Sequence, residues 1–371
     1  MRITSPVRSA LRSRVRFPAF FVLIVLCAGV LLAGRTESAP RAPSVQTTVY
    51  LPIISLLRLD SIAFLSNRDG NTELYRMRAD GSEQTRLTNT SADEGDFAWS
   101  PDGAHIVFIS QRDGNAEIYV MNADGSNQLR LTTTPAFEDL PKWSPDGSKI
   151  MFVSARDGQE AIYVMNADGS NQSRLTDTPI ALSRPDWSPD GSKIVFVSTR
   201  DTTDEIYVMN RDGSVQTRLT NTTLTKSWPV WSPTGTKIAF VADLFSGTTI
   251  TSELDIMNTD GSGLQPLFID SVSFPDSLSW SPDGSKIVFV AAASDATRKV
   301  SVVNADGTGR TSFMETNTRR FEFYPRWSPD GTQIAFGAGE IYVMQADGSN
   351  RTRLTDSGVG ESGFPKWSPT K

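Results

Sequence analysis

The sequence has very few of the residues on which nucleophilic and metal chemistry usually depend. It contains one cysteine, Cys27, and one histidine, His105, in 371 residues. Zinc sites usually need several His or Cys ligands, and a Ser-His-Asp hydrolase needs an activating histidine. His105 lies in "GAHIVF", where equivalent segments carry a lysine, so we interpret it as an ordinary strand residue. We therefore predict no metal, no cofactor and, because a lone cysteine cannot pair within the chain, no disulfide.

The chain also lacks a basic region of the kind that binds nucleic acid. Residues 1–40 hold six of its 36 basic and one of its 42 acidic side chains, which leaves 30 basic and 41 acidic residues elsewhere. A nucleic-acid-binding surface needs clustered Lys and Arg, and beyond residue 40 the sequence offers no cluster larger than Arg319-Arg320. We therefore expect no nucleic-acid partner. We also expect no calcium loop, because aspartate-rich turns such as "NADGSN" lack the ligand pattern of such a loop.

One long uncharged run stands near the N-terminus. Five arginines precede "FPAFFVLIVLCAGVLLAG" at residues 17–34, which is the pattern of an export signal. The run of 18 residues is also just long enough to span a bilayer, so a cleaved signal and an uncleaved signal anchor both stay open. We expect residues 1–40 to be this signal, residues 41–60 to be a polar linker containing prolines, and the remainder to be exported from a bacterial cytoplasm.

From residue 61 to residue 371 the sequence repeats itself. Its repeats are marked by tryptophans spaced 40 to 49 residues apart, each within "WSPDG" or a variant: Trp99, Trp143, Trp187, Trp231, Trp280, Trp327 and Trp367. Each period has room for four short strands, with proline and glycine in the turns at "SPDG" and "NADG". A period near 44 residues with four strands is typical of a β-propeller blade.

The strand after each motif predicts how these units pack. In "KIMFVS", residues 149–154, both alternating faces of the strand are apolar, so both must be covered. Stacking of each blade against two neighbours would cover them. We expect each motif tryptophan to be a wedge in the core between blades rather than a ligand-stacking residue.

The segments "WSPDGSKIVFVS", "EIYVMNADGSNQ" and "RLT" resemble the TolB-like β-propeller repeat, also called a WD40-like repeat, over residues 61–371. The resemblance implies a propeller of four-stranded blades, often found in exported bacterial proteins and often a protein-binding platform. The α/β domain that precedes the TolB propeller has no counterpart in the short linker here, which puts a TolB-type role in doubt.

The number of blades follows from the two ends of the repeat region. Six complete units begin at the motif tryptophans, while residues 61–88 supply three strands that lack a tryptophan strand. The C-terminal "FPKWSPTK" supplies that strand. We predict an all-β, seven-bladed propeller of four-stranded antiparallel blades, in which N- and C-terminal segments share the closing blade.

Function should lie on the face whose loops differ between blades. The residue three positions before each motif tryptophan should open toward the central channel, and Trp228 is the only tryptophan outside the repeat position. Aromatic and arginine side chains are enriched at binding hot spots, although such residues could also simply fill the channel mouth. The candidate binding residues are Asp96, Asp139, Arg184, Trp228, Asp276, Tyr324 and Phe364.

Two functions remain open at this stage. The first is a non-catalytic, monomeric scaffold, in the periplasm or at the cell surface, that binds a protein, a peptide or a cell-envelope polymer, with a possible membrane tether through residues 17–34. The alternative is a hydrolase or lyase acting on a carbohydrate. It would use a carboxylate pair, with Glu138 or Asp139 opposite Asp96 or Asp276.

Overall fold

The computed structural model describes residues 60–177, 180, 184–246, 249–270, 278–292, 298–313 and 324–369. All of them belong to the second of two compact units, Leu56–Lys371. The expected signal and nearly all of the linker lie outside the described residues. Within the described part, no helix is long and apolar enough to cross a membrane.

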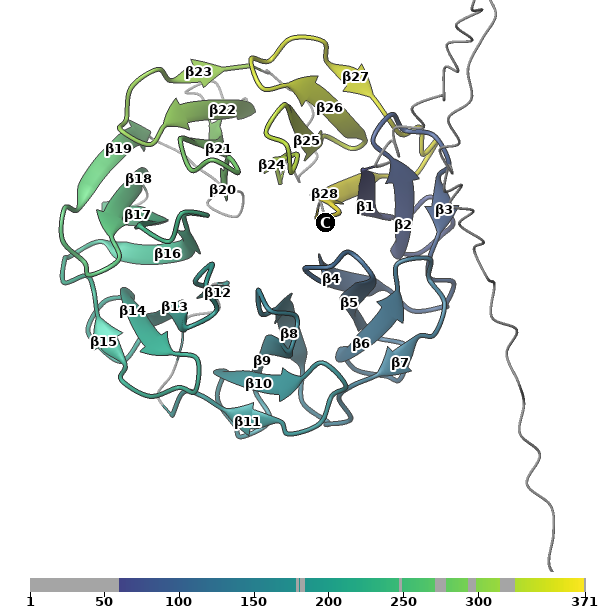
Figure 1. The fold of residues 1–371 in the computed structure, drawn as a ribbon, viewed down its shortest axis with the longest axis horizontal. Coiled ribbons are helices and arrows are strands. Elements are labelled where there is room, and N and C mark those ends of the chain that lie inside the picture. The colour runs from purple at the N-terminus through teal and green to yellow at the C-terminus, as the bar shows by residue number, and fades with distance from the viewer. Residues whose placement is uncertain are drawn as a thin grey trace, which may run out of the picture. The chain divides into compact units, whose positions relative to one another are not determined.

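Seven antiparallel sheets of four strands each surround a central axis (Figure 1). We number these sheets as blades I to VII. Blade I contains β28 (Ser362–Trp367), β1 (Ser61–Ser66), β2 (Glu73–Arg78) and β3 (Thr85–Arg86). Blade II contains β4 (Glu94–Trp99), β5 (His105–Ser110), β6 (Glu117–Asn122) and β7 (Leu129–Arg130). Blade III contains β8 (Glu138–Trp143), β9 (Lys149–Ser154), β10 (Ala161–Asn166) and β11 (Ser173–Arg174).

The remaining four blades follow in chain order around the ring. Blade IV contains β12 (Asp186–Trp187), β13 (Lys193–Ser198), β14 (Glu205–Asn210) and β15 (Thr217–Arg218). Blade V contains β16 (Thr225–Trp231), β17 (Lys237–Ser246), β18 (Thr249–Asn258) and β19 (Gln265–Asp270). Blade VI contains β20 (Ser279–Trp280), β21 (Lys286–Ala292), β22 (Arg298–Asn304) and β23 (Thr311–Ser312). Blade VII contains β24 (Arg326–Trp327), β25 (Gln333–Gly337), β26 (Ile341–Gln345) and β27 (Thr352–Arg353).

The "SPDG" motif forms the turn between the first two strands of a blade. In blade II, the backbone N–H of Gly103 donates to the carbonyl of Ser100 over 2.8 Å, and Gly103 has a φ of 66°. The Asp102 carboxylate accepts the backbone N–H of Ala104 over 2.9 Å. Glycine fits the left-handed backbone that this turn requires, which explains why the motif recurs.

The closing blade pairs the two ends of the propeller, as predicted. Strand β28 lies antiparallel to β1, with Trp367 opposite Ile62. The backbone N–H of Ser368 donates to the carbonyl of Ser61 over 2.8 Å, and the Ser66 hydroxyl donates to the carbonyl of Glu361 over 2.9 Å. This pairing covers the inner edge of β1, which would otherwise be an open strand edge.

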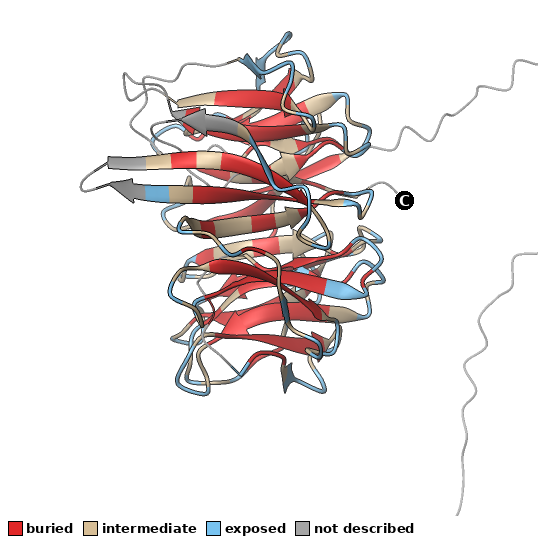
Figure 2. Cartoon of the chain, turned by 90° about the vertical axis from the view of Figure 1, so that its left-hand side faces the viewer, coloured by how far each residue is buried: buried red, intermediate tan, exposed pale blue. Residues whose placement is uncertain are grey.

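The apolar core lies between adjacent blades. The middle strands are almost wholly buried, and exposed residues gather at the turns (Figure 2). Trp143 of blade III belongs to one buried cluster with Val107 of blade II and Phe152. Six motif tryptophans are between 4% and 8% exposed, and Trp99 is half-buried. In three blades the indole N–H also donates to a carbonyl of the preceding blade: Trp99 to Lys366, Trp280 to Val230 and Trp367 to Arg326.

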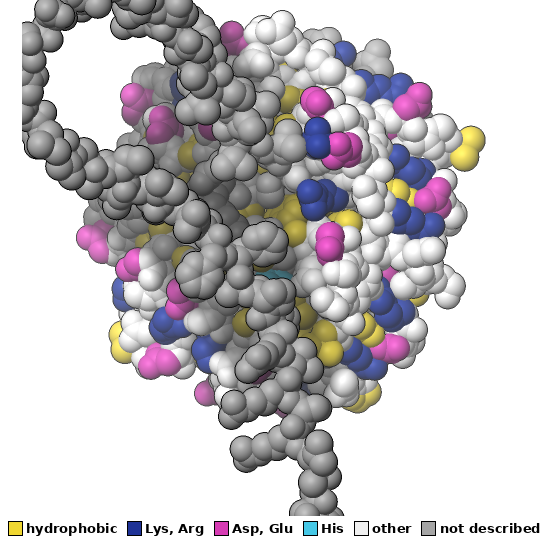
Figure 3. Space-filling view, turned by 45° about the vertical axis from the view of Figure 1, so that its right-hand side comes forward, with side chains coloured by type: hydrophobic (Ala, Val, Ile, Leu, Met, Phe, Trp, Pro, Cys, Tyr) yellow, Lys and Arg dark blue, Asp and Glu magenta, His cyan; other side chains and the backbone are white. Residues whose placement is uncertain are grey.

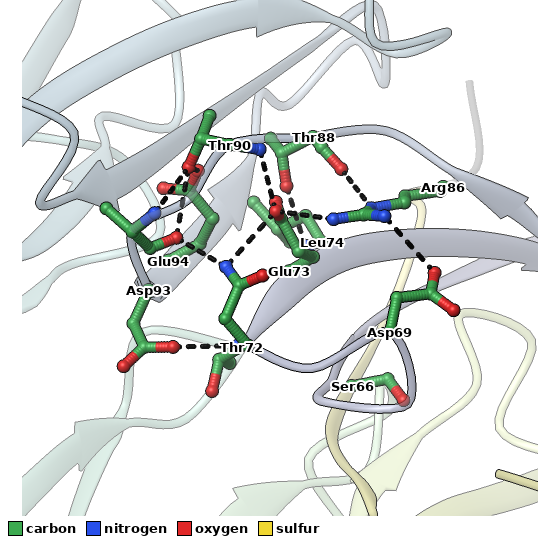
Figure 4. A network of polar contacts seen from close by, with 12 residues as sticks. Ser66, Asp69, Thr72, Glu73, Leu74, Arg86, Thr88, Thr90, Asp93 and Glu94 are labelled. Carbon is green, nitrogen blue, oxygen red and sulfur yellow. Dashed lines mark hydrogen bonds and ion pairs between the residues drawn. The ribbon is translucent and has the colours of Figure 1, made fainter. Parts of the chain in front are cut away.

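A repeated polar network ties the outer strands of the blades to the loops between them. In blade I the Glu73 carboxylate, which is fully buried, accepts from the Arg86 guanidinium and from the Thr90 backbone N–H, each over 2.7 Å (Figure 4). The Thr88 hydroxyl accepts the backbone N–H of Leu74 over 2.9 Å. Because these groups replace the missing partners of short outer strands, we assign their recurrence to stability rather than to function.

Candidate binding channel

A cavity of about 560 Å³ occupies the centre of the ring, and every blade contributes to its wall. Five repeat positions form the wall: the motif tryptophan, the motif proline two residues after it, and each of the three residues that precede the tryptophan. Toward one end the wall contains five motif prolines, Pro101, Pro233, Pro282, Pro329 and Pro369. The other end carries Asp96, Leu140, Arg184 and Trp228, four of the positions predicted to open toward the channel.

A bulge in the inner strand presents several of these side chains. The register between β8 and β9 shifts between Asp139 and Lys142, and between β16 and β17 it shifts between Ser227 and Val230. Within these shifts Leu140 has a φ of 54° and Trp228 a φ of 55°. Bulges redirect side chains, and both residues line the cavity. A left-handed backbone is costly for such residues, so the surrounding strands must hold it in place.

Asp96 is clamped between cations from two other blades. The Arg184 guanidinium lies 2.6 Å from one carboxylate oxygen, and the Lys366 ammonium lies 2.6 Å from the other. Burial alone would raise the pKa of Asp96, but the charges of Arg184 and Lys366 outweigh it and hold the pKa well below its usual range. Asp96 is therefore an ionised binding or structural group and a poor proton donor.

Aromatic side chains flank this ion-pair cluster. The Arg184 guanidinium lies over the Trp228 ring, 5.6 Å from its centroid, in a cation–π contact. Tyr324 and Phe364 stack with their ring centroids 4.0 Å apart. Neither of these two contributes to the cavity wall itself.

The position just before each motif tryptophan was missed by the sequence analysis. Lys142, Asp186, Arg326 and Lys366 occupy it in four blades and line the cavity. Lys142 pairs with Asp186, whose other oxygen accepts the backbone N–H of Trp231 over 2.8 Å. The varied charge of this position among otherwise similar repeats was the available signal.

Arg326 differs from the other channel cations because no carboxylate contacts it among the described residues. Its guanidinium donates to the backbone carbonyls of Pro325 over 3.0 Å and Leu278 over 3.4 Å. Burial, together with the nearby charge of Arg184, lowers the pKa of Arg326 to about 10. Burial likewise lowers the pKa of Lys366 to about 8, against the opposing effect of Asp96.

The carboxylates proposed for catalysis are differently placed. Glu138 is fully buried, accepts from Arg156 over 3.0 Å, and belongs to the repeat network. Asp139 does not line the cavity, and one of its oxygens accepts the backbone N–H of Leu140 over 2.7 Å. Burial raises the pKa of Asp139. Asp276 lies outside the described residues. In the part of the chain that is described, no group of three His, Cys, Asp or Glu residues could hold a metal ion.

The visible outer surface mixes charges of both signs (Figure 3). Some charges at the surface form pairs, such as Arg174 with Asp157 at 3.5 Å. The channel holds its charges in a recess among tryptophan and proline rings.

Comparison with known proteins identifies the repeat. The family model described as the TolB beta-propeller domain matches residues 59–139 and 135–323. TolB from Acinetobacter baumannii is 22% identical over 84% of this chain and 67% of its own, with a TM-score of 0.58. No curated protein matched in sequence.

Enzymes share the same architecture. An oligogalacturonate lyase from Vibrio parahaemolyticus is 14% identical over 80% of this chain and 86% of its own, with a TM-score of 0.59. A puromycin-hydrolysing peptidase from Mycobacterium tuberculosis is 13% identical over 78% of this chain, with a TM-score of 0.61, and this chain spans half of its length. At these identities the likeness is one of fold alone.

Proposed function

Because the chain belongs to the TolB beta-propeller family, we propose that it is a non-catalytic scaffold that binds a protein, a peptide or a cell-envelope polymer. Its binding face is the channel mouth together with the loops that differ between blades. The observation that carries this proposal is the convergence of Asp96, Arg184 and Lys366, from three different blades, next to Trp228.

The chemistry of the channel supports binding more than catalysis. Asp96 has an ion pair at each oxygen, and these cations lower its pKa, so it stays ionised and is a poor proton donor. Glu138 serves the repeat network. A recess that combines aromatic rings with arginine instead fits the composition of binding hot spots.

Export of the propeller is part of the same proposal. The arginines and the apolar run at residues 17–34 support passage through a membrane, with the propeller in the periplasm or at the cell surface. Mass spectrometry of the mature N-terminus tests whether the segment is removed. A cytoplasmic propeller with an intact N-terminus in the fractionated native host would contradict export.

Capture of partners from cell envelopes tests the binding face. We expect the double variant Trp228→Ala with Tyr324→Ala to lose at least about tenfold in partner capture, since aromatic hot-spot residues typically cost 2 kcal/mol or more when truncated. Leu129→Ala with Val215→Ala is the matched control, because both residues are exposed apolar side chains at the outer strands. Full capture by the channel variant, with an unchanged melting temperature, would refute the proposed face.

A further inference from the structure

The channel has more positive than negative side chains in its wall, in a chain that is negatively charged overall. Four cations line the cavity, Lys142, Arg184, Arg326 and Lys366, against two carboxylates, Asp96 and Asp186. The two carboxylates are already engaged by Lys142, Arg184 and Lys366. Asp139, behind the wall, also acts on Arg184. Arg326 is thus the channel cation that lacks a carboxylate among the described residues.

A partly buried guanidinium is costly to leave without a counter-ion, and charge-assisted hydrogen bonds to it are strong. Arg326 uses its Nη1 atom for two backbone carbonyls. Among the described residues, the Nε and Nη2 atoms of Arg326 have no hydrogen-bond partner. The Nε atom of Arg184 also lacks a partner there, but it is itself buried and is not offered to the cavity. The recess therefore has unused donors, and a planar acceptor such as a carboxylate matches the geometry of a guanidinium.

The rest of the wall indicates what carries that carboxylate. Five motif tryptophans, Trp228, eight prolines, Leu140 and Leu278 surround the charged side chains. Ser279 is the one uncharged hydroxyl or amide side chain in the wall as described. A saccharide needs many hydrogen-bond partners for its hydroxyls, because buried polar groups without partners are costly. An acidic peptide segment with apolar neighbours fits this wall better.

We propose that the channel receives a carboxylate of a peptide or protein partner, either a C-terminus or an acidic side chain flanked by apolar residues, and that Arg326 anchors it. This inference rests on the proposed binding function and names the chemical group that is recognised. Arg184 and Lys366 contribute positive charge around the anchor, while Trp228 and Leu140 contact the apolar neighbours at the mouth.

The test uses the full-length chain and defined probes. Acetyl-Leu-Leu with a free carboxylate, its C-terminal amide and digalacturonate are each titrated up to about 20 mM. Binding is followed by tryptophan fluorescence, because six tryptophans line the cavity, and by calorimetry. We expect roughly millimolar binding of the acid, and binding of the amide weakened by about tenfold or more. Addition of salt should weaken binding of the acid and leave binding of the amide nearly unchanged.

Variants locate the anchor. We expect Arg326→Gln to bring the affinity for the acid down to that for the amide, and Arg326→Lys to keep part of the preference. Arg211→Gln is the matched control for lost charge, since Arg211 is exposed and its guanidinium forms a 3.5 Å ion pair with the exposed Asp146. This control should bind the acid like the unmodified chain.

Three outcomes would overturn the inference. The first is equal affinity for the peptide acid and its amide, or no binding of either. The second is a folded Arg326→Gln variant that still prefers the acid to the amide as strongly as the unmodified chain. The third is tighter binding of digalacturonate than of the peptide acid, which would assign the channel to a saccharide. If any of these occurred while envelope capture still depended on Trp228 and Tyr324, the proposed scaffold function would stand and only the carboxylate site would fall.

Discussion

Blades I to IV and blades V and VI share strand order but differ in what covers their outer parts. In each of the first four, an arginine lies over a tyrosine that pairs with a core phenylalanine; in blade IV, Arg200 lies 4.4 Å from the Tyr207 centroid. The tyrosine hydroxyl donates to an aspartate in the loop, as Tyr207 does to Asp201. In blade V the corresponding partner of Phe240 is Asp255, and in blade VI the partner of Phe289 is Ser301.

Hydrogen bonds between adjacent blades differ in the same way. In blades I to IV a glutamine amide donates to a leucine carbonyl of the preceding blade, for example Gln172 to Leu131 over 2.9 Å. Blade V has the exposed Leu264 at that position. Blades I to IV therefore share the tyrosine that blades V and VI replace, and blade V also replaces the glutamine, while the hydrophobic layers between blades continue around the ring. The sheet core and the outer network are separable contributions to the fold.

The largest expected effect concerns blade I, whose regular network depends on the closing strand. Deletion of residues 362–371 should lower the free energy of unfolding by at least about 3–5 kcal/mol, because it removes the buried Trp367 and exposes the inner edge of β1. Chemical denaturation measures this loss. Trp367→Ala should also lower the free energy of unfolding, but by less than the deletion. An unchanged melting temperature after the deletion would contradict closure by β28.

The arginines of the regular blades should differ among themselves. Arg156 contacts the fully buried Glu138 at 3.0 Å, whereas Arg200 contacts Gln216 and Ser198. Removal of Arg156 leaves a buried carboxylate without its cation, so Arg156→Ala should cost about 3 kcal/mol of unfolding free energy. Arg200→Ala loses a cation–π contact and hydrogen bonds to neutral acceptors and should cost about 1 kcal/mol. Equal losses in urea denaturation would show that the Glu138 pair does not contribute separately.

In blade V the substituted position should be a source of instability. Asp255 is 4% exposed, and its buried Oδ1 atom has no hydrogen-bond partner among the residues that the structure describes. Burial, reinforced by Glu253 and opposed by Lys226, raises the pKa of Asp255 to about 6. A raised pKa means that the folded chain favours the protonated form, so the stability it contributes is present at low pH and is lost as pH rises through 6.

The neutral replacement Asp255→Asn should therefore stabilise the chain by roughly 2 kcal/mol at pH 7.5 and by much less near pH 4. Lys226 keeps acidic neighbours in the variant, since Glu205, Glu253 and Asp243 also act on it. Melting curves of the two chains at both pH values provide the measurement. Destabilisation by Asn at pH 7.5 would show that the carboxylate pairs with Lys226 more strongly than burial penalises it.

The difference between these blades also explains what the sequence could reveal. Strand order, blade number and closure follow from features that recur in every unit, such as the turn at Gly103 and the tryptophan of the first strand. The candidate site depends on features that do not recur. Trp228 and Arg184 stood at a position that repeat spacing could identify, and they do meet. The sequence could not reveal that Arg326 has no carboxylate partner among the described residues. This property depends on which cations Asp96 and Asp186 pair with across the channel, and only the folded structure shows those pairs.

The smallest expected effect concerns a position at which blades V and VI have a more suitable residue than blade IV. At one position of the third turn, every blade has a backbone with positive φ. Blades V and VI place Gly263 and Gly309 there, and blades II, III and VII place Asn127, Asn171 and Asn350. Blade IV instead has Val215 at a φ of 53°, with 68% of the residue exposed. A β-branched residue is strongly disfavoured in this conformation, and asparagine tolerates it.

Val215→Asn should therefore raise the free energy of unfolding by about 1 kcal/mol, since it relieves backbone strain and removes an exposed apolar side chain. Asn171→Val, the reciprocal change at the equivalent position in blade III, should lower it by a similar amount. Urea denaturation of both variants makes the comparison within regular blades alone. A loss of stability in Val215→Asn would mean that the valine side chain makes a contact worth more than the strain, and that regularity of sequence is a poor guide to local stability even among blades I to IV.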